Sequence, residues 1–400
     1  MPNLRKAMMG AAGAAGGGGY TLWAWGLNDT GVLGQGDVID RSSPVQIGTD
    51  SDWASISAGN IAGASGAEGS CAAVKTDGTL WTWGLNDGAY NGDGGQLGLG
   101  DTVNRSSPTQ VGALTTWRAC FMGYGVALGF KTDGTAWVWG DGEFGSMGRG
   151  SLNESNSSPI QLGSLTDWSS DTHLNAWGGS RNFFVLKPDG TIWAWGQNGD
   201  GELGLGNTTQ INSPTQVGAL TTWYRGVGAG PTQLVNKDDG TMWVWGKGNF
   251  GQLGQGDTAN SSSPIQLGSL TNWKYGKEAS QIHSIAGGIW VFIVKGDGTA
   301  WTWGYDSANR GTGGRPDDKV RKSSPVQVGS LTTWSMPTQG YTHAMAVTTS
   351  GALFTWGRNG SGQLGQSDVI YRSSPVQVGS LTDWKLLAAV RNVSVALKPA

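Results

Sequence analysis

A four-residue motif, Trp-x-Trp-Gly, recurs along the whole chain and constrains its fold more than any other feature. Its copies begin at Trp23, Trp81, Trp137, Trp193, Trp243 and Trp301, with a seventh, variant copy at Phe354. Successive copies lie 58, 56, 56, 50, 58 and 53 residues apart. A fixed period of this length is the signature of an architecture built from copies of one unit. We therefore expect one repeat domain, although 400 residues would ordinarily suggest two or three domains.

Within each repeat the side chains alternate with the period of a β-strand. In Thr79-Leu80-Trp81-Thr82-Trp83 the two tryptophans lie on one face and Leu80 and Thr82 on the other. An Asp-Gly turn precedes this strand, and its glycine supplies the positive φ that a tight hairpin needs. The turn carboxylates are Asp77, Asp133, Asp189, Asp239 and Asp297. Their identical repeat position indicates a backbone role and not a catalytic one.

A second register completes the repeat. After a Gly-x-Leu-Gly-like turn and a Ser-Pro strand, a lone tryptophan begins the next strand, at Trp53, Trp117, Trp168, Trp223, Trp273, Trp334 and Trp384. The 70 glycines and a charged fraction of 14% make long helices improbable. Four short strands per repeat and seven repeats predict an all-β fold, a seven-bladed β-propeller of four-stranded blades.

The last repeat is incomplete, and the start of the chain supplies what it lacks. Residues 395–400 match an interior strand, but no Asp-Gly turn or tryptophan strand follows. We expect residues 20–26 to pair with residues 393–398, which closes the ring without a free sheet edge. The sequence thus divides into a Gly/Ala-rich arm, residues 1–19, and a propeller, residues 20–400.

The arm lies outside every repeat. Glycines at positions 10 and 13 interrupt the apolar core that a signal peptide would need. A short anchor on a flexible linker fits this composition better. Leu4, Met8 and Met9 offer apolar side chains, and Arg5 and Lys6 offer positive charge. We expect these five residues to bind another protein.

The segments that differ among repeats are candidates for a binding surface. Aromatic and arginine side chains at such positions suit a protein-binding or glycan-binding face, and surface drift without a ligand accounts for them equally well. The candidates are Asp87 and Tyr90 in a long insertion, Tyr124 after a lone tryptophan, and Tyr305, Arg310, Arg315, Lys319 and Arg321 in the sixth repeat.

Residues of the types used in catalysis do not assemble into a site. The three histidines, His173, His283 and His343, fall in different repeats without a shared register, so we expect no enzyme activity, metal or cofactor. Cys71 and Cys120 are interpreted as buried thiols, with a disulfide as the alternative. A net charge of −3 without a basic cluster argues against nucleic-acid binding, and no apolar run is long enough to span a membrane.

The repeat resembles that of the regulator of chromosome condensation family. The shared pattern is Val-Lys-x-Asp-Gly-Thr-x-Trp-x-Trp-Gly, followed by a Gly-Gln-Leu-Gly turn, and it is clearest in residues 74–101 and 294–303. The resemblance covers residues 20–400 and implies a seven-bladed propeller. Members of this family include guanine-nucleotide exchange factors, chromatin binders, inhibitors of enzymes, and bacterial and phage proteins of unknown role. The eukaryotic Gly-x-x-His-Ser/Thr signature is approached by residues 340–344 alone, which favours a bacterial or phage-like type.

These observations lead to a functional hypothesis and one alternative. We expect a non-enzymatic structural or binding protein, a phage virion component in the tail, fibre, neck or capsid decoration. Its arm would bind other virion proteins, and its loops a host-surface protein or glycan. The alternative is a soluble, cytoplasmic regulator, inhibitor-like or exchange-factor-like, that binds a protein through one propeller face.

Overall fold

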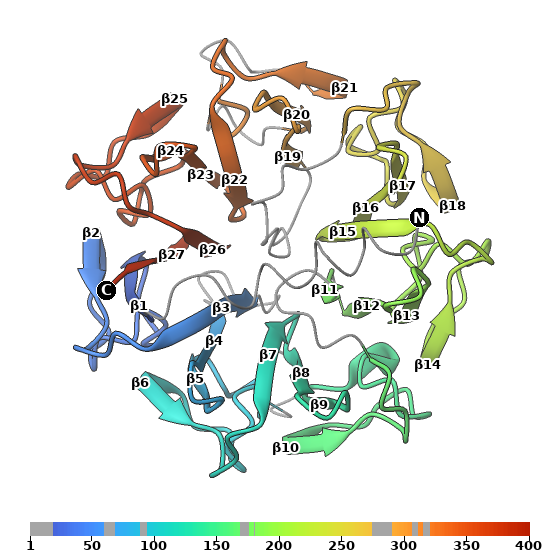
Figure 1. Cartoon of the computed structure of the whole chain (residues 1–400), viewed down its shortest axis with the longest axis horizontal. Helices are drawn as coiled ribbons and strands as arrows, with labels where there is room; N and C mark the ends of the chain where they lie inside the picture. The colour runs from blue at the N-terminus through green and yellow to red at the C-terminus, as the bar shows by residue number, and fades with distance from the viewer. Residues whose placement is uncertain are drawn as a thin grey trace.

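The computed structural model describes residues 19–59, 69–88, 94–168, 176–179, 181–273, 290–305, 311–314 and 321–400. Within these residues the chain forms antiparallel strands and one short 3-10 helix, η1 (Glu143–Gly145). The strands gather in groups that radiate from a common axis, as Figure 1 shows. The fold is therefore all-β and propeller-like.

Each group of strands is a blade, numbered here along the ring. Blade 1 is β26 (Leu386–Val390), β27 (Val393–Pro399), β1 (Tyr20–Gly26) and β2 (Arg41–Gln46); blade 2 is β3 (Trp53–Gly59), β4 (Ser70–Lys75), β5 (Leu80–Gly84) and β6 (Arg105–Gln110). Blade 3 is β7 (Trp117–Met122), β8 (Val126–Lys131), β9 (Ala136–Gly140) and β10 (Asn156–Gln161); blade 4 is β11 (Ala176–Gly178), β12 (Asn182–Leu186), β13 (Ile192–Gly196) and β14 (Ile211–Gln216).

The remaining blades follow the same plan. Blade 5 is β15 (Trp223–Ala229), β16 (Thr232–Lys237), β17 (Met242–Gly246) and β18 (Ser261–Gln266); blade 6 is β19 (Trp290–Val294), β20 (Ala300–Gly304) and β21 (Lys322–Gln327); blade 7 is β22 (Trp334–Gln339), β23 (His343–Thr348), β24 (Leu353–Gly357) and β25 (Arg372–Gln377). Blades 3, 4, 5 and 7 are separate four-stranded sheets, and blade 6 shows three strands among the described residues. Blades 1 and 2 are joined into one eight-stranded sheet by the pair Tyr20↔Trp53 between β1 and β3.

The two ends of the chain share blade 1, as the incomplete last repeat predicts. Strand β1 pairs with β27 in unbroken register from Tyr20↔Pro399 to Gly26↔Val393. The backbone N–H of Ala400 donates to the oxygen of Gly19 at 3.3 Å. The junction of the termini thus stands where other blades have their Asp-Gly turn.

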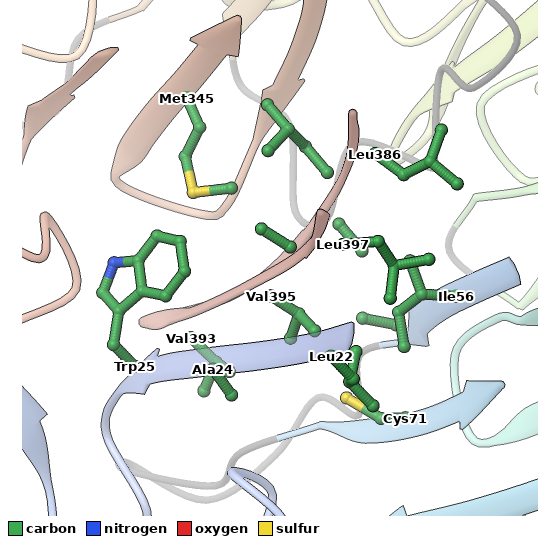
Figure 2. Packing of buried hydrophobic residues seen from close by; sticks show 14 of the residues in the cluster. Leu22, Ala24, Trp25, Ile56, Cys71, Met345, Leu386, Val393, Val395 and Leu397 are labelled. Carbon is green, nitrogen blue, oxygen red and sulfur yellow. The ribbon is translucent and has the colours of Figure 1, made fainter. Parts of the chain in front are cut away.

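Apolar side chains from both ends of the chain fill the junction. Leu22 of β1 and Val395 and Leu397 of β27 are fully buried in one cluster. Ile56 of blade 2 and Met345 of blade 7 pack into the same cluster (Figure 2). The closing blade is therefore held by packing on both of its sides.

The second tryptophan of each motif joins its blade to the preceding one. Its Nε1 donates to a backbone oxygen in or beside the preceding Gly-x-Leu-Gly turn. The pairs are Trp25–Gln363, Trp83–Val32, Trp139–Gln96, Trp195–Ser146, Trp245–Glu202, Trp303–Gln252 and Trp356–Thr312, at 2.8 to 3.0 Å. These bonds, and the burial of the rings, fix the angle between blades.

The first tryptophan of the motif fastens the hairpin turn within its own blade. In blade 2, Trp81 Nε1 donates to Thr79 Oγ1 at 2.9 Å, and that hydroxyl donates to Asp77 Oδ1 at 2.7 Å. The backbone N–H and hydroxyl of Thr79 hold the pKa of Asp77 below its usual value. Lys75 Nζ lies 4.9 Å from the ring centroids of both Trp53 and Trp81. The recurring aspartates are thus turn residues, as their position in the repeat indicates.

Candidate binding face

Antiparallel strands place successive connections at opposite ends of a blade, so the ring has two different faces. We call the one with the Asp-Gly turns the turn face; it is built from nearly identical segments such as residues 76–78 and 132–134. The other, the loop face, carries the connections from first to second and from third to fourth strands, such as residues 123–125 and 141–155. Among the described residues, connections of varied composition such as 141–155 and 247–260 therefore lie on the loop face.

One cluster on the loop face brings together two of the predicted residues. Tyr305 of blade 6 stacks on Phe250 of blade 5, with ring centroids 5.6 Å apart and planes 19° from parallel. The guanidinium of Arg321 lies 5.1 Å from the Phe250 centroid and 5.4 Å from that of Tyr305. Arg321 Nη1 also donates to the oxygen of Asn249 at 3.1 Å, and its side chain is exposed. The seam between these blades thus presents an aromatic pair covered by a positive charge.

A second cluster of the same kind contains Tyr124. The guanidinium of Arg181, from blade 4, lies 5.1 Å from the Tyr124 centroid and 4.7 Å from that of Phe144, both from blade 3. Arg181 Nη1 also forms an ion pair with Glu143 Oε2 at 3.0 Å. Arg181 and Phe144 have φ angles of 57° and 60°, in the left-handed region that non-glycine residues rarely adopt. The backbone is therefore held in an uncommon conformation around this cluster.

The sequence predictions missed Phe144, Arg181 and Phe250. A signal for two of them exists, because Phe144 and Phe250 stand at one repeat position, directly before the first glycine of the Gly-x-Leu-Gly-like turn. An alignment of the repeats on that glycine shows the shared aromatic position.

The other predicted binding residues do not join these clusters. Asp87 is exposed and accepts a long hydrogen bond, 3.5 Å, from Asn104 Nδ2. Nine further predicted residues lie outside the described part of the chain: Leu4, Arg5, Lys6, Met8, Met9, Tyr90, Arg310, Arg315 and Lys319.

Residues with catalytic potential are used in packing where the structure describes them. His343 Nε2 lies 2.9 Å from Ser394 Oγ, and that hydroxyl donates to the oxygen of Gln363 at 2.8 Å. Complete burial lowers the pKa of His343 to about 4, so its ring is neutral at neutral pH. Cys71 and Cys120 are buried free thiols, and burial raises the pKa of Cys120. His173 and His283 lie outside the described residues.

The described residues contain neither a metal-binding cluster nor a membrane-spanning helix. No three His, Cys, Asp or Glu side chains among them gather as a metal site requires. No described helix has the length and apolar character needed to cross a membrane.

The radial sheets, the tryptophan repeat and the closure by both chain ends define a β-propeller assembled from sequence repeats. The model of the regulator of chromosome condensation (RCC1) repeat matches residues 21–61, 77–128, 189–232, 239–286 and 350–397, more than half of the chain. The chain therefore belongs to the RCC1 repeat family.

Two curated relatives match about half of this chain. The human E3 ubiquitin-protein ligase HERC2 is 29% identical over 202 residues, which are 48% of this chain and 4% of the ligase. The ultraviolet-B receptor UVR8 of Arabidopsis thaliana is 33% identical over 198 residues, which are 48% of this chain and 41% of the receptor. The matched part thus spans less than half of either relative.

Solved structures show the same fold over nearly the whole chain. Human WBSCR16 has a TM-score of 0.77 at 20% identity, covering 95% of this chain and 98% of that one. Prp20p of Saccharomyces cerevisiae, described with its binding to Gsp1p and histones, has a TM-score of 0.77 at 16% identity, covering 98% and 94%. These identities establish the fold alone. The relatives named here are eukaryotic, and the bacterial or phage-like type predicted from the sequence stays a prediction.

Proposed function

We propose that this protein is a non-enzymatic binding protein whose loop face holds another protein. The observation that carries the proposal is the pair of arginine–aromatic clusters, Tyr124–Phe144–Arg181 and Phe250–Tyr305–Arg321, on one face of the ring. Tyrosine, tryptophan and arginine are enriched among the few residues that carry most of the binding energy in protein interfaces.

The scaffold beneath the clusters favours this role. The ring offers a rigid support, because seven buried tryptophans join successive blades and each cluster bridges two blades. A rigid support lowers the entropic cost of ordering an interface. We infer that the ring is a complete seven-bladed propeller, as in the family it belongs to. Prp20p, described as binding Gsp1p and histones, gives a protein-binding precedent for this fold.

A role in a virion is a second proposal, and the position of Gly19 favours one arrangement for it. Gly19 lies against Ser51 and Asp52 and receives a hydrogen bond from Ala400, so the described chain begins on the turn face. A protein tethered by residues 1–18 to a particle would present its loop face outward. Attachment through the arm and binding through the loop face are then compatible.

The binding proposal is tested by comparing the two faces. A photo-crosslinking amino acid replaces Tyr305 on the loop face or, as the control, the exposed Leu114 on the turn face. We expect a specific adduct from position 305, identified by mass spectrometry, and none from position 114. Arg181→Ala and Arg321→Ala should each weaken the purified pair by about tenfold or more in calorimetry. Equal labelling from both positions, or affinity unchanged in both variants, would contradict the proposal.

A further inference from the structure

Arg358, on the loop face of blade 7, forms no ion pair within the part of the chain that the structure describes. It directly follows β24, and its backbone N–H donates to the oxygen of Thr342 at 2.8 Å. The neighbouring arginine of the same loop is paired, since Arg372 Nη2 lies 2.6 Å from Asp368 Oδ2. The half-buried Arg358 is therefore a positive charge that its own blade leaves uncompensated.

The guanidinium of Arg358 and the hydroxyl of Tyr371 converge on an open space beside Gly360. A Cβ added to Gly360 would stand 3.5 Å from Tyr371 Oη, 3.6 Å from Arg358 Nε and 3.9 Å from Arg358 Nη2. Nε and Nη2 form the edge of a guanidinium that can bind both oxygens of one carboxylate. Gly360 and Tyr371 are exposed, so the space is reached from solvent.

One aspartate fixes both sides of this space. Asp368 Oδ1 accepts from Asn359 Nδ2 at 2.8 Å and from the backbone N–H of Ile370 at 2.9 Å. Asn359 is fully buried and stands between the arginine and the glycine in the chain, and Ile370 directly precedes the tyrosine. Because one carboxylate holds both segments, the donors are in position before a ligand binds, which lowers the entropic cost of binding.

Blade 2 contains a carboxylate at the equivalent place. Asp87 stands at the repeat position of Gly360, and Asn104 stands at that of Tyr371. Asn104 Nδ2 donates to Asp87 Oδ2 at 3.5 Å. Blade 7 keeps a donor at the second position, has glycine in place of the carboxylate, and has an arginine where blade 2 has Leu85. Blade 7 therefore lacks the acceptor that blade 2 supplies from its own chain.

The surroundings of the donors restrict the ligand. Val369 and Ile370, beside the tyrosine, are 59% and 62% exposed, and Tyr341, on the loop that bonds the backbone of Arg358, is 43% exposed. Because Arg372 is paired, Arg358 supplies one net positive charge. One charge with a bidentate edge matches a carboxylate better than a phosphate that carries close to two charges. An acidic side chain flanked by apolar residues therefore complements this site.

We propose that Arg358 and Tyr371 bind an aspartate or glutamate side chain, flanked by apolar residues, of the protein held by the loop face. The two carboxylate oxygens accept from Nε and Nη2 of Arg358, and one of them also accepts from the hydroxyl of Tyr371. Tyr305 and Arg321 of the adjoining blade 6 stand at the same two repeat positions in exchanged order, so one partner can contact both blades (Figure 1). The inference rests on the proposed function for the nature of the ligand.

A defined probe tests the site in the full chain. The tripeptide acetyl-Leu-Asp-Leu-amide is titrated against the protein, with acetyl-Leu-Asn-Leu-amide as the uncharged control, and binding is followed by the NMR signals of the peptide methyl groups. We expect the acidic peptide to bind and to shift the Arg358 Nε–H signal, and the control to bind about tenfold or more weakly.

Substitutions locate the binding on blade 7. Arg358→Gln should weaken the acidic peptide by about tenfold or more, and Tyr371→Phe by about fivefold. Lys247→Gln is the matched control, because Lys247 stands at the same repeat position in blade 5 and is already paired with Asp200 at 3.0 Å. It should leave the affinity unchanged.

Gly360→Asp should block the site by supplying the carboxylate from the chain itself. The φ of Gly360 lies outside the left-handed region and a Cβ meets ordinary contact distances there, so this variant should fold. Thermal melting of each variant confirms that the ring is intact. Equal binding of the two peptides, or unchanged affinity in both Arg358→Gln and Gly360→Asp, would overturn the carboxylate site. A phosphoserine tripeptide that binds more than about tenfold tighter than the acidic one would assign the site to phosphate instead.

The purified partner separates this inference from the proposed function. If Arg321→Ala weakens the partner and Arg358→Gln does not, the loop face binds a protein and the role of Arg358 is wrong. If position 305 labels no protein while the acidic tripeptide still binds at Arg358, the proposed function is contradicted and the carboxylate site stands.

Discussion

Trp25 donates its Nε1 hydrogen to the backbone oxygen of Gln363, 338 positions later in the chain, at 3.0 Å. This bond joins blade 7 to blade 1 in the way that the other six motif tryptophans join their blades. The last inter-blade contact is therefore as regular as the interior ones, although it connects opposite ends of the chain. The ring must be complete before this contact can form, so we expect it to form late in folding.

Replacing a second motif tryptophan should be costly. Trp195 is fully buried, packs against Trp168 and Phe183, and bonds Ser146 of the preceding blade. Trp195→Ala should lower the free energy of unfolding by about 3–5 kcal/mol, as is typical for a buried aromatic residue. Urea denaturation followed by tryptophan fluorescence measures the loss. Thr209→Ala, at an exposed turn, is the control and should change stability by less than about 0.5 kcal/mol.

One glycine of the Gly-x-Leu-Gly-like turn should tolerate no side chain. A Cβ at Gly98 would stand 2.7 Å from Trp139 Nε1, and the φ of Gly98 is +71°. Gly112 has a similar φ of +59° with nothing within 4 Å, so it isolates the backbone strain. We expect Gly112→Ala to cost about 1–2 kcal/mol from strain alone, and Gly98→Ala to cost clearly more. Matching melting temperatures for the two variants would show that the Trp139 contact adapts freely.

The histidine at the ring junction should make stability fall in acid. The folded pKa of His343, about 4, lies below the ordinary 6.5, so protons bind the unfolded chain more tightly. This contribution is complete above pH 6.5 and declines as the pH falls towards 4, by roughly 3 kcal/mol in all. His343→Gln should flatten the difference in unfolding free energy between pH 7.5 and pH 4.5. An equally steep profile in that variant would assign the acid sensitivity to other groups.

Neither His343→Gln nor His173→Ala should abolish binding.

The arm and the first strand should behave differently when removed. Deleting residues 1–18 leaves Gly19 and all of β1, so thermal melting should stay close to that of the full chain. Deleting residues 1–26 removes the partner of both β27 and β2 and should prevent cooperative folding. If the arm is a particle anchor, the shorter deletion also abolishes incorporation, measured by co-sedimentation. Incorporation without the arm would exclude that role.

Repetition explains which features could be predicted from the sequence. Comparison of the seven repeats predicts three features. These are the shared face of Trp81 and Trp83, the turn at Asp77, and the pairing of residues 20–26 with the C-terminal strand. The arginine–aromatic clusters could not be predicted from the repeat, because Arg181 contacts Tyr124 and Phe144 across the boundary between two blades. Contacts between blades depend on radial packing, and no local pattern in the sequence encodes which loop of one blade faces which loop of the next.

The meeting of Gly19 and Ala400 at a turn position has a topological consequence. The other Asp-Gly turns occupy equivalent places in their blades, so the ring has no intrinsic first blade. Linking the two ends and opening the chain at another turn, such as residues 132–134, would preserve every strand pair. A domain fused directly to Gly19 or to Ala400 would begin on the turn face, away from the loop face.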